Sequence, residues 1–527
     1  MRGERRIQSD VVVVGGGPVG MLIAAELAGY GVDTLLLEVR DRVSVRPKAT
    51  TLHARAVQCL ARRGHLPEQR ARHTGAASSS PFHFAGLPGL VITAPETEPE
   101  PILKCPQAEL ERRFEERARA AGARILREHR VTDAVQDRDG VRVTADGPGG
   151  PVTCTTRYAV GADGARSMLR ELAGIESDIH AATVAALMAT VTVTDPDVLP
   201  PGWHRTPRGW IVAKRDPAGS THIRTLNCTG AHEDRKLPPT LEDLRREASW
   251  IAGRDIAMED ARWLSRFSDV TRLARTFRSG RVFLVGDAAH VHFPIGGQGL
   301  STGVLDALNL GWKLALAVHG KAGADLLDTY DLERRPAAQR VIDNTRAQLA
   351  LMRPGAEADA LRGVFAAVLA EDPRHERLSG MISAQDTVYP GRGGCLSPTE
   401  GAFLGNMPLH TDEGETDVIE LLRDGRPLLL LFGEKGDLHG REALAWAGIL
   451  RVVHVLPTAA APADALLVRP DGYLAWTSEG GRLANALEVH FARKEPAPVA
   501  GLVAQRSAAV QPTASASIAS ATARASV

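Results

Sequence analysis

The segment from residue 10 to residue 38 constrains the fold of this chain more than any other part of the sequence. It reads as a buried strand, DVVVV, then the glycine turn GGGPVG, then a helix, MLIAAELAGYG, and then a second strand, VDTLLLE. Gly15, Gly17 and Gly20 fit the pattern GxGxxG, and Glu38 follows at about the 20-residue spacing expected of an acidic partner. This order predicts a βαβ unit that binds the pyrophosphate of a dinucleotide.

Each residue of this unit has a separate physical role. Gly15 allows the tight turn, Gly17 lets a pyrophosphate approach the backbone, and Gly20 lets the helix pack closely on the strand. The helix N-terminus offers unpaired N–H groups and the positive end of its dipole to phosphates. A carboxylate at Glu38 accepts from ribose hydroxyls, which indicates an unphosphorylated ribose and leaves both NAD and FAD open.

A second glycine-rich segment, GDAAHVHFPIGGQGLSTGVLDALNLGWKL, runs from Gly286 to Leu314. It follows the apolar run RVFLV and precedes a long helix, so its glycines indicate a loop that a ligand approaches closely. Asp287 ends the predicted strand, which is where open α/β sheets bind ligands. Asp306 and Asn309 are interpreted as residues on the face of the following helix rather than as ligands.

Composition argues against several classes of protein. The 527 residues suffice for two to four domains. Lys plus Arg equals Asp plus Glu at 63 each, and no basic cluster stands out, which argues against nucleic-acid binding. The five cysteines lie far apart, with no CxxC and no Cys/His metal spacing, so we expect no metal site and reduced thiols. Cys395, alone in GRGGC, is expected to be inert.

The two ends of the sequence give no sign of a membrane anchor. The start, MRGERRIQSD, is charged, and the apolar run behind it is interrupted by glycines. It has neither the cleavage site of a signal peptide nor the length of a membrane span, so we expect a soluble, cytoplasmic protein. Residues 501–527 are small and polar, which predicts a disordered tail.

Four further motifs decide between NAD and FAD. They are RPKATTLHAR from Arg46, PQAEL from Pro106, VGADGARSMLR from Val160, and GRVFLVGD ending at Asp287. Together with GGGPVG they resemble the single-component FAD-dependent aromatic hydroxylases, the flavoprotein monooxygenase family that includes p-hydroxybenzoate hydroxylase. The nearest likeness is to the bacterial branch that oxidises aromatic polyketides. It extends from about residue 10 to about residue 492, in the family's order.

The resemblance implies which residues hold non-covalent FAD. Those expected to contact its adenosine and pyrophosphate half are Gly15, Gly17, Pro18, Gly20, Glu38 for the ribose, and Val131 for the adenine. Those expected near the ribityl chain and flavin are Arg46, Gln107, Asp163, Asp287, Pro294, Gly297, Gly299, Leu300 and Ser301. Asp163 belongs to a DG motif that is also linked to NAD(P)H use. No metal ligand is implied.

The flavin loop departs from the family in one place. Where relatives often have Met-Asn, this chain has Leu300-Ser301, which puts any Asn side-chain contact in doubt and keeps the backbone N–H. The helix after Gln298 is expected to direct unpaired N–H groups at the pyrimidine edge of the flavin, which becomes negative on reduction. His290 and His292 flank the loop. We interpret His290 as a supporting residue of GDAAH rather than a general base.

The implied activity is hydroxylation of a polycyclic aromatic, polyketide-type substrate in antibiotic biosynthesis. NADPH or NADH reduces FAD, O2 then forms a flavin C4a-hydroperoxide, and hydroxyl transfer follows. Baeyer–Villiger insertion stays open, with Arg46 as the cation that would favour the deprotonated peroxide. A non-oxygenating flavin dehydrogenase or reductase and a non-enzymatic FAD-binding scaffold also stay open. The halogenase motif WxWxIP and a second GxGxxG followed by an acid are absent. The family's habit predicts a homodimer.

The expected fold class is α/β, with three parts. A Rossmann-like FAD-binding domain takes residues 1–80, 102–175 and 272–347, and an antiparallel-sheet substrate domain takes 81–101 and 181–271. A helical linker, 348–396, leads to a thioredoxin-like domain without CxxC at 397–500. Trp210 and Val212 share one strand face, and His222 and Arg224 share a face of the next strand, so either pair could line the substrate pocket. Trp210 could equally be core, and His222 and Arg224 surface.

Overall fold

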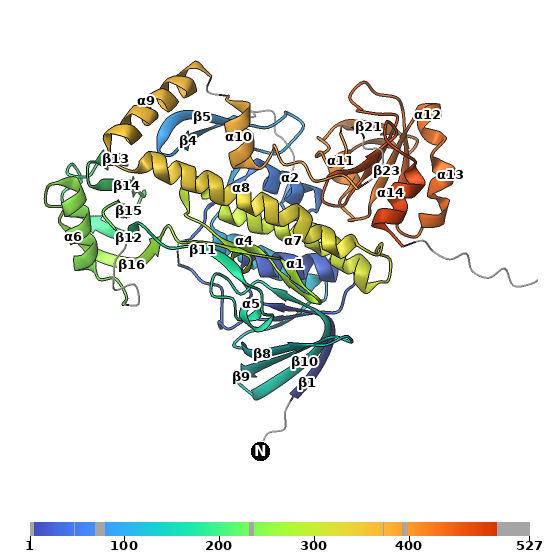
Figure 1. Cartoon of the computed structure of the whole chain (residues 1–527), viewed down its shortest axis with the longest axis horizontal. Coiled ribbons are helices and arrows are strands. Elements are labelled where there is room, and N and C mark those ends of the chain that lie inside the picture. The colour runs from blue at the N-terminus through green and yellow to red at the C-terminus, as the bar shows by residue number, and fades with distance from the viewer. Residues whose placement is uncertain are drawn as a thin grey trace, which may run out of the picture. The chain divides into compact units, whose positions relative to one another are not determined.

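The predicted βαβ unit is present at the centre of an eight-stranded sheet. The structure, a computed structural model, describes residues 5–46, 48–68, 79–230, 237–372, 374–392, 397 and 399–492. Strand β1 (Arg5–Val14), helix α1 (Pro18–Gly29) and strand β2 (Thr34–Leu37) form the unit, and β1 pairs in parallel with β2 and β10 (Gly150–Gly161) (Figure 1). The predicted tail and Cys395 lie outside the described residues.

The sheet gathers strands from two distant parts of the chain. Its order is β18-β19-β10-β1-β2-β7, and β9 and β8 continue it from β10. The further strands are β7 (Arg124–Leu126), β8 (Arg130–Gln136), β9 (Val141–Gly147), β18 (Arg278–Ser279) and β19 (Val282–Leu284). Val11 and Val13 face one apolar cluster while Val12 and Val14 face another, so the strand is buried on both sides. That double burial explains the unbroken run of valines.

Three helices pack against one face of this sheet. They are α1, α4 (Gln107–Ala120) and the 20-residue α7 (Gly299–Val318), which share a single apolar cluster. Helix α7 begins directly after Gln298, as the sequence predicts. Helix α8 (Thr329–Met352) follows and packs on α7.

A five-stranded antiparallel sheet supplies the second layer of the fold. Its order is β13-β14-β15-β12-β16. The strands are β12 (Ala185–Val193), β13 (Gly202–Thr206), β14 (Gly209–Arg215), β15 (Thr221–Asn227) and β16 (Met258–Ser268). The antiparallel sheet expected within residues 181–271 is present, and its segments ALMATVTVT, GWIVAKR and THIRTLN form most of β12, β14 and β15. Helix α6 (Leu241–Ala252) covers the face that carries Ile211, Ala213 and Ile223, so alternate residues point to the opposite face.

Smaller elements connect these two sheets. Strand β3 (Thr51–His53) pairs with β6 (Ile102–Lys104), and β11 (Ser177–His180), β17 (Thr271–Ala274) and β20 (His290–Val291) form a three-stranded sheet. Helices α2 (Ala54–Arg62) and α5 (Met168–Leu172) complete this region. Strands β4 (Ser79–Phe84) and β5 (Leu87–Thr93) form a separate hairpin. Helices α9 (Ala356–Glu371) and α10 (Glu376–Ser383) contact β5, and the expected linker is helical and packs on this hairpin through Leu369 and Ile382.

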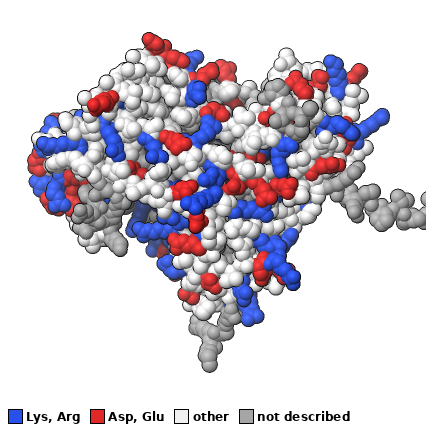
Figure 2. Space-filling view, in the orientation of Figure 1, with Lys and Arg blue, Asp and Glu red and all other residues white. Residues whose placement is uncertain are grey.

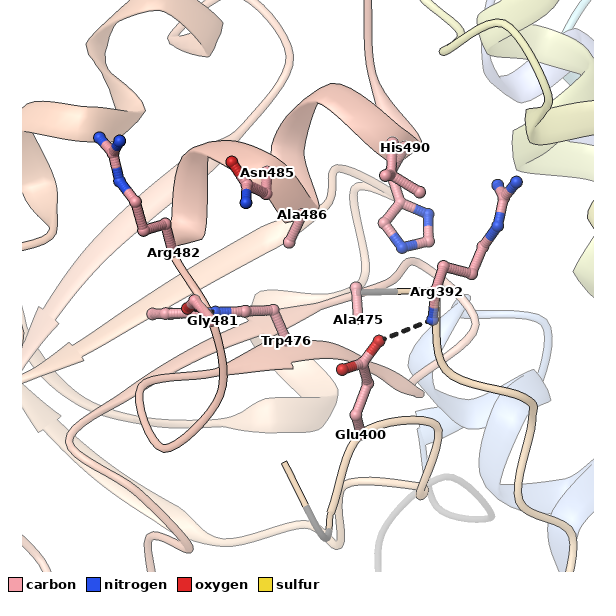
Figure 3. Close-up of a pocket in the computed structure, with 10 residues that line it drawn as sticks. Arg392, Glu400, Ala475, Trp476, Gly481, Arg482, Asn485, Ala486 and His490 are labelled. Carbon is pink, nitrogen blue, oxygen red and sulfur yellow. Dashed lines mark hydrogen bonds between the residues drawn. The ribbon is translucent and has the colours of Figure 1, made fainter. Parts of the chain in front are cut away.

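The C-terminal part has its own mixed sheet, of order β24-β23-β25-β26. Its strands are β23 (Leu428–Phe432), β24 (Arg451–Val455), β25 (Ala465–Val468) and β26 (Leu474–Thr477). The remaining elements are β21 (Pro408–Thr411), β22 (Gly414–Asp417), α11 (Val418–Leu421), α12 (Gly433–Asp437), α13 (Gly440–Ala443) and α14 (Leu483–His490). A pocket of about 270 Å³ lies between β26 and α14, where Glu400 accepts a 2.9 Å hydrogen bond from the Arg392 backbone N–H (Figure 3).

A buried cluster of charges joins this part to α7 and α8. The guanidinium of Arg469 donates to both carboxylate oxygens of Glu333, and Lys313 Nζ donates to Glu333 Oε2 at 2.7 Å. Asn309, also buried, donates to Glu333 and to Asp471. All of these groups are nearly inaccessible to water. The unpaired charges that separation would leave make this contact costly to open.

Candidate active site

One large cavity lies where the carboxyl ends of the parallel strands meet the N-terminus of α1. Its volume is about 1470 Å³. Val14, Ala162 and Val285, which end or follow β1, β10 and β19, all line it. Pockets for a single drug-sized ligand span about 300–1,000 Å³, so this cavity has room for a dinucleotide and a second molecule. Its position is the one at which open α/β sheets bind ligands.

Most of the residues predicted from sequence to hold FAD line this single cavity. They are Gly15, Gly17, Pro18, Glu38, Gln107, Val131, Asp163, Asp287, Pro294, Gly297, Gly299 and Leu300. Three do not, namely Gly20, Arg46 and Ser301. The chain therefore brings residues from four motifs, the first and last of which lie about 270 residues apart, to one place.

The glycine turn forms a cradle that leaves room for a phosphate. Gly15 has φ of +104°, and a Cβ there would lie 2.4 Å from the Ala162 carbonyl oxygen. A Cβ on Gly20 would lie 1.9 Å from the Gly15 carbonyl oxygen, so Gly20 lets α1 approach β1 from behind the cavity. A Cβ on Gly17 would meet no protein atom within 4 Å. The free space is therefore where a pyrophosphate would approach the backbone.

Glu38 is held where a ribose would lie. Its carboxylate is 5% exposed and accepts hydrogen bonds from the backbone N–H groups of Gly16 and Arg40. Glu111, on α4, lies near Glu38. Burial and the Glu38 carboxylate raise the pKa of Glu111 to about 7. Sequence reasoning missed Glu111, which directly follows the motif PQAEL. Glu111 stands four residues after Gln107, so the two side chains share a face of α4.

Two further carboxylates line the cavity and fit a ligand rich in hydroxyl groups. Asp163 Oδ2 accepts the Leu169 backbone N–H at 3.1 Å, and its buried Oδ1 has no hydrogen-bond partner among the described residues. Burial raises the pKa of Asp163 and of Asp287. A buried acceptor without a partner, such as Asp163 Oδ1, is stabilised by a hydroxyl donor, and the ribityl chain of FAD supplies such donors.

His53 contacts the loop before α7 and the first turn of that helix. Gly296 and Gly297 have φ of +74° and +65°. The ring nitrogen Nε2 of His53 lies 2.7 Å from the Gly296 carbonyl oxygen, and the His53 backbone N–H donates to Ser301 Oγ at 3.0 Å. The Ser301 hydroxyl is thus used within the protein and does not line the cavity, so it does not replace the amide that relatives carry there. Leu300 keeps the apolar contact.

Asp306 lies on α7 and does not line the cavity, in keeping with its interpretation as a helix residue rather than a ligand. The sequence analysis did not indicate that its side chain is completely buried. Its carboxylate accepts from His290 Nε2 at 2.7 Å, Arg334 Nε at 2.8 Å and the Gly286 backbone N–H at 3.1 Å. These partners come from other elements, which helical spacing alone does not reveal. Burial opposes ionisation, but His290 and Arg334 outweigh it and lower the pKa of Asp306.

The two loop histidines differ in position. His290, 2% exposed and paired with Asp306, does not line the cavity, which fits its interpretation as a supporting residue. His292 does line it, and its Nδ1 lies 2.9 Å from the Phe293 carbonyl oxygen. Burial lowers the pKa of His292 to about 4, so the ring is neutral near pH 7.

The structure does not bring Arg46 to the cavity. Arg46 is exposed, and Lys48 lines the cavity in its place. The described residues from 39 to 50 form neither helix nor strand, so no periodicity in this segment indicates which side chain faces inward. The predicted influence of Arg46 on flavin chemistry therefore has no geometric support, and Lys48 is the cation of this segment that lines the cavity.

The candidate substrate residues divide between core and cavity. Trp210 is 3% exposed, its indole N–H donates to the Met352 carbonyl oxygen at 2.6 Å, and it does not line the cavity. Its alternative interpretation as core therefore fits the structure. Val212, His222 and Arg224 all line the cavity from the inner face of the five-stranded sheet.

Comparison with known proteins agrees with this geometry. The family model described as "FAD binding domain" matches residues 8–345, and the one described as "Aromatic-ring hydroxylase, C-terminal" matches residues 397–494. The chain belongs to the FAD-dependent aromatic-ring hydroxylases. FAD is therefore its cofactor, and the hydroxylase is a flavin monooxygenase that uses NAD(P)H, as is typical of this family.

Its relatives include enzymes of antibiotic metabolism. The 12-dehydrotetracycline 5-monooxygenase/anhydrotetracycline 6-monooxygenase of Streptomyces rimosus subsp. rimosus is 37% identical, over 92% of this chain and 98% of the relative. The rifampicin monooxygenase of Rhodococcus hoagii is 36% identical over the same shares. Among solved structures, the OxyS anhydrotetracycline hydroxylase from Streptomyces rimosus aligns with a TM-score of 0.82 and 36% identity, covering 92% of this chain and 99% of that one.

The described residues contain no group of three or more metal-ligating side chains and no helix long and apolar enough to cross a membrane. On the face shown in Figure 2, basic and acidic side chains are interspersed rather than gathered by sign. That distribution agrees with the zero net charge of the whole sequence.

Proposed function

We propose that this hydroxylase inserts one oxygen atom into a polycyclic aromatic, polyketide-type substrate. The observation that supports it is the shape of the cavity, which continues from the dinucleotide cradle into a chamber lined by Phe82, Trp203, Trp263 and Phe267. Flat aromatic side chains of this kind pack well on fused rings. Relatives named for anhydrotetracycline and rifampicin act on such polycyclic compounds.

The chain's own residues position and enclose the reacting molecules. Bound FAD, once reduced by NAD(P)H, supplies the activation of O2. Gly17 and the N-terminus of α1 would hold its pyrophosphate, and Asp163 and Asp287 would orient its ribityl chain. The N–H groups at the start of α7 stabilise negative charge beside Leu300. The aromatic chamber holds the substrate and excludes water from the reaction.

The test is substrate-dependent oxygenation by the purified holoenzyme. Anhydrotetracycline and rifampicin are the first probes, each with NADPH and with NADH. We expect at least one polycyclic compound to stimulate NAD(P)H oxidation and to yield a product heavier by one oxygen atom. A new hydroxyl on a ring identifies hydroxylation, whereas a ring-expanded ester identifies Baeyer–Villiger insertion. An oxidised product without added oxygen would identify a dehydrogenase. If no polycyclic compound stimulated NAD(P)H oxidation, the result would favour a non-enzymatic FAD-binding protein.

A further inference from the structure

The substrate side of the cavity has a wall of positive charge. Three side chains on it are Lys104, Lys214 and Arg224, called the basic wall below. Lys104 ends β6, while Lys214 and Arg224 lie on the inner face of β14 and β15. The wall is thus assembled from the FAD-binding part and from the five-stranded sheet.

Strand register places two of these cations close together. Val212 pairs with Arg224, and Lys214 pairs with His222 on the same face, so Lys214 and Arg224 are diagonal neighbours. Diagonal neighbours across antiparallel strands lie about 7–8 Å apart at Cα, within reach of long side chains. Lys104 approaches from the other side, where burial and the Lys214 ammonium lower its pKa. One small acidic group could therefore contact more than one of them.

Lys214 and Arg224 face no acidic side chain of the described lining that belongs to the five-stranded sheet, and Lys104 Nζ donates to Thr51 Oγ1 at 2.9 Å. The four acidic side chains that line the cavity are the cofactor-side Glu38, Glu111, Asp163 and Asp287. Asp216, beyond the end of β14, lies 3.9 Å from His222 Nε2 and does not line the cavity. The Arg224 side chain is exposed within the cavity, and none of the described acidic lining residues belongs to the five-stranded sheet. A ligand that supplies a carboxylate there gains a charged hydrogen bond.

The neighbouring His83 adds no further charge, because its ring is neutral near pH 7. Burial holds the pKa of His83 at about 4, and His83 stacks on Phe82 with ring centroids 4.8 Å apart. His222 bonds Thr190 Oγ1 through Nδ1 at 2.9 Å. Trp263 and Phe267 line the same chamber. Fixed cations therefore stand beside an aromatic, otherwise apolar surface.

We propose that the basic wall binds an anionic oxygen group, a carboxylate or an enolate, carried by the polycyclic aromatic substrate. The inference rests on the proposed function and narrows its substrate class. The aromatic chamber selects fused rings, and Lys214 and Arg224 select among them for an acidic substituent. A carboxylate matches the planar donor fork of Arg224. A dinucleotide phosphate is the competing source of negative charge, and the experiment separates the two.

The probes are anthraquinone-2-carboxylate and its neutral analogue anthraquinone-2-carboxamide. Their affinities for the FAD-loaded enzyme are measured by equilibrium dialysis at neutral pH, for the wild type, Lys214→Gln and Arg224→Gln. Arg215→Gln is the matched control, because Arg215 is exposed on the same strand, its guanidinium donates to the Pro196 carbonyl oxygen, and it does not line the cavity. FAD content and far-UV circular dichroism check that each variant is folded.

We expect the wild type to bind the carboxylate at least about tenfold more tightly than the carboxamide, as charged hydrogen bonds require. Lys214→Gln and Arg224→Gln should each weaken carboxylate binding by about tenfold or more and change carboxamide binding by less than about twofold. Arg215→Gln should change neither. KM for NADPH and NADH should be the same in all variants.

Equal affinity for the two probes, or carboxylate binding unchanged in both variants, would overturn the proposal. A rise in KM for NADPH with unchanged carboxylate affinity would also overturn it, because the cations would then serve the dinucleotide. Oxygenation of neutral substrates only would contradict this inference and leave the proposed function standing. A charge preference in an enzyme that oxygenates nothing would support the basic wall and refute the proposed function.

Discussion

Replacing Gly17 by alanine tests the cofactor cradle in the simplest way. Gly17 has φ of −71° and ψ of 177°, an extended conformation that alanine adopts without strain. Because a Cβ there would meet no protein atom within 4 Å, the protein itself has space for it. The remaining cost to the fold is the poorer N-cap, which is below about 1 kcal/mol. The new methyl group would instead occupy the space beside a bound pyrophosphate.

The expected loss is therefore in FAD affinity. Displacing a phosphate from one backbone N–H forfeits a charged hydrogen bond worth about 1.5–3 kcal/mol, which raises the Kd for FAD by about 10- to 150-fold. Kd is measured by titrating apoprotein with FAD and following the quenching of flavin fluorescence. Urea denaturation of the apoprotein measures the change in its free energy of unfolding.

Two other glycines of the same helix serve as controls. Gly29→Ala also meets no atom within 4 Å and lies in α1 away from the cavity, so Kd should not change. Gly20→Ala places its Cβ 1.9 Å from the Gly15 carbonyl oxygen, so both folding and FAD binding should suffer. If Gly17→Ala binds FAD within about threefold of the wild type, the Gly17 backbone does not face a phosphate. If it destabilises the apoprotein as much as Gly20→Ala, the space beside Gly17 is not open.

Three further substitutions test Glu26, a buried carboxylate of α1, the buried Asp306 and the cavity-lining Asp287. Glu26→Gln should cost about 3–5 kcal/mol of unfolding free energy in urea, because it leaves Arg63 buried without its partner. Burial opposes ionisation of Glu26, but Arg63 holds the pKa of Glu26 at about 2. The wild type should therefore lose this stabilisation as pH falls from about 4.5 towards 2. The free energy of unfolding of the variant should lack this dependence on pH. Asp306→Asn should similarly cost about 3–5 kcal/mol through Arg334, and a melting curve like that of the wild type would contradict the pairing. Asp287→Asn should raise the Kd for FAD by about tenfold, and an unchanged Kd in the same fluorescence titration would remove Asp287 from the cofactor site.

The parts of the fold that were predictable are those with local signals. The order of strand, glycine turn, helix and acidic residue from residue 10 to Glu38 specifies the βαβ unit, because each step depends on neighbours in sequence. Alternation of apolar residues likewise predicts an antiparallel sheet within residues 181–271. It puts Trp210 with Val212, and His222 with Arg224, on shared strand faces, but it does not decide which face lines the pocket; in the structure Val212 and Arg224 lie on one face at the cavity. Trp210 shares that face, yet α8 covers it through the Met352 carbonyl oxygen.

The remainder depends on contacts between distant residues. Asp306 has the spacing of a surface position, and only Arg334 and His290, brought by other elements, make its burial tolerable. The basic wall is equally invisible in the sequence, because Lys104 and Lys214 stand 110 positions apart and come from different sheets. No pattern in the sequence of β6 indicates that Lys104 lies near Lys214 of β14.

The central claim is that this hydroxylase transfers an oxygen atom from O2 to an aromatic substrate. Turnover under ¹⁸O2, with NADPH or NADH and a polycyclic substrate that stimulates its oxidation, followed by mass spectrometry of the product, tests it directly. The account predicts one ¹⁸O atom in the product and none when the label is supplied as water. A product without label, or NAD(P)H oxidation whose electrons all appear as hydrogen peroxide with every polycyclic substrate, would contradict it.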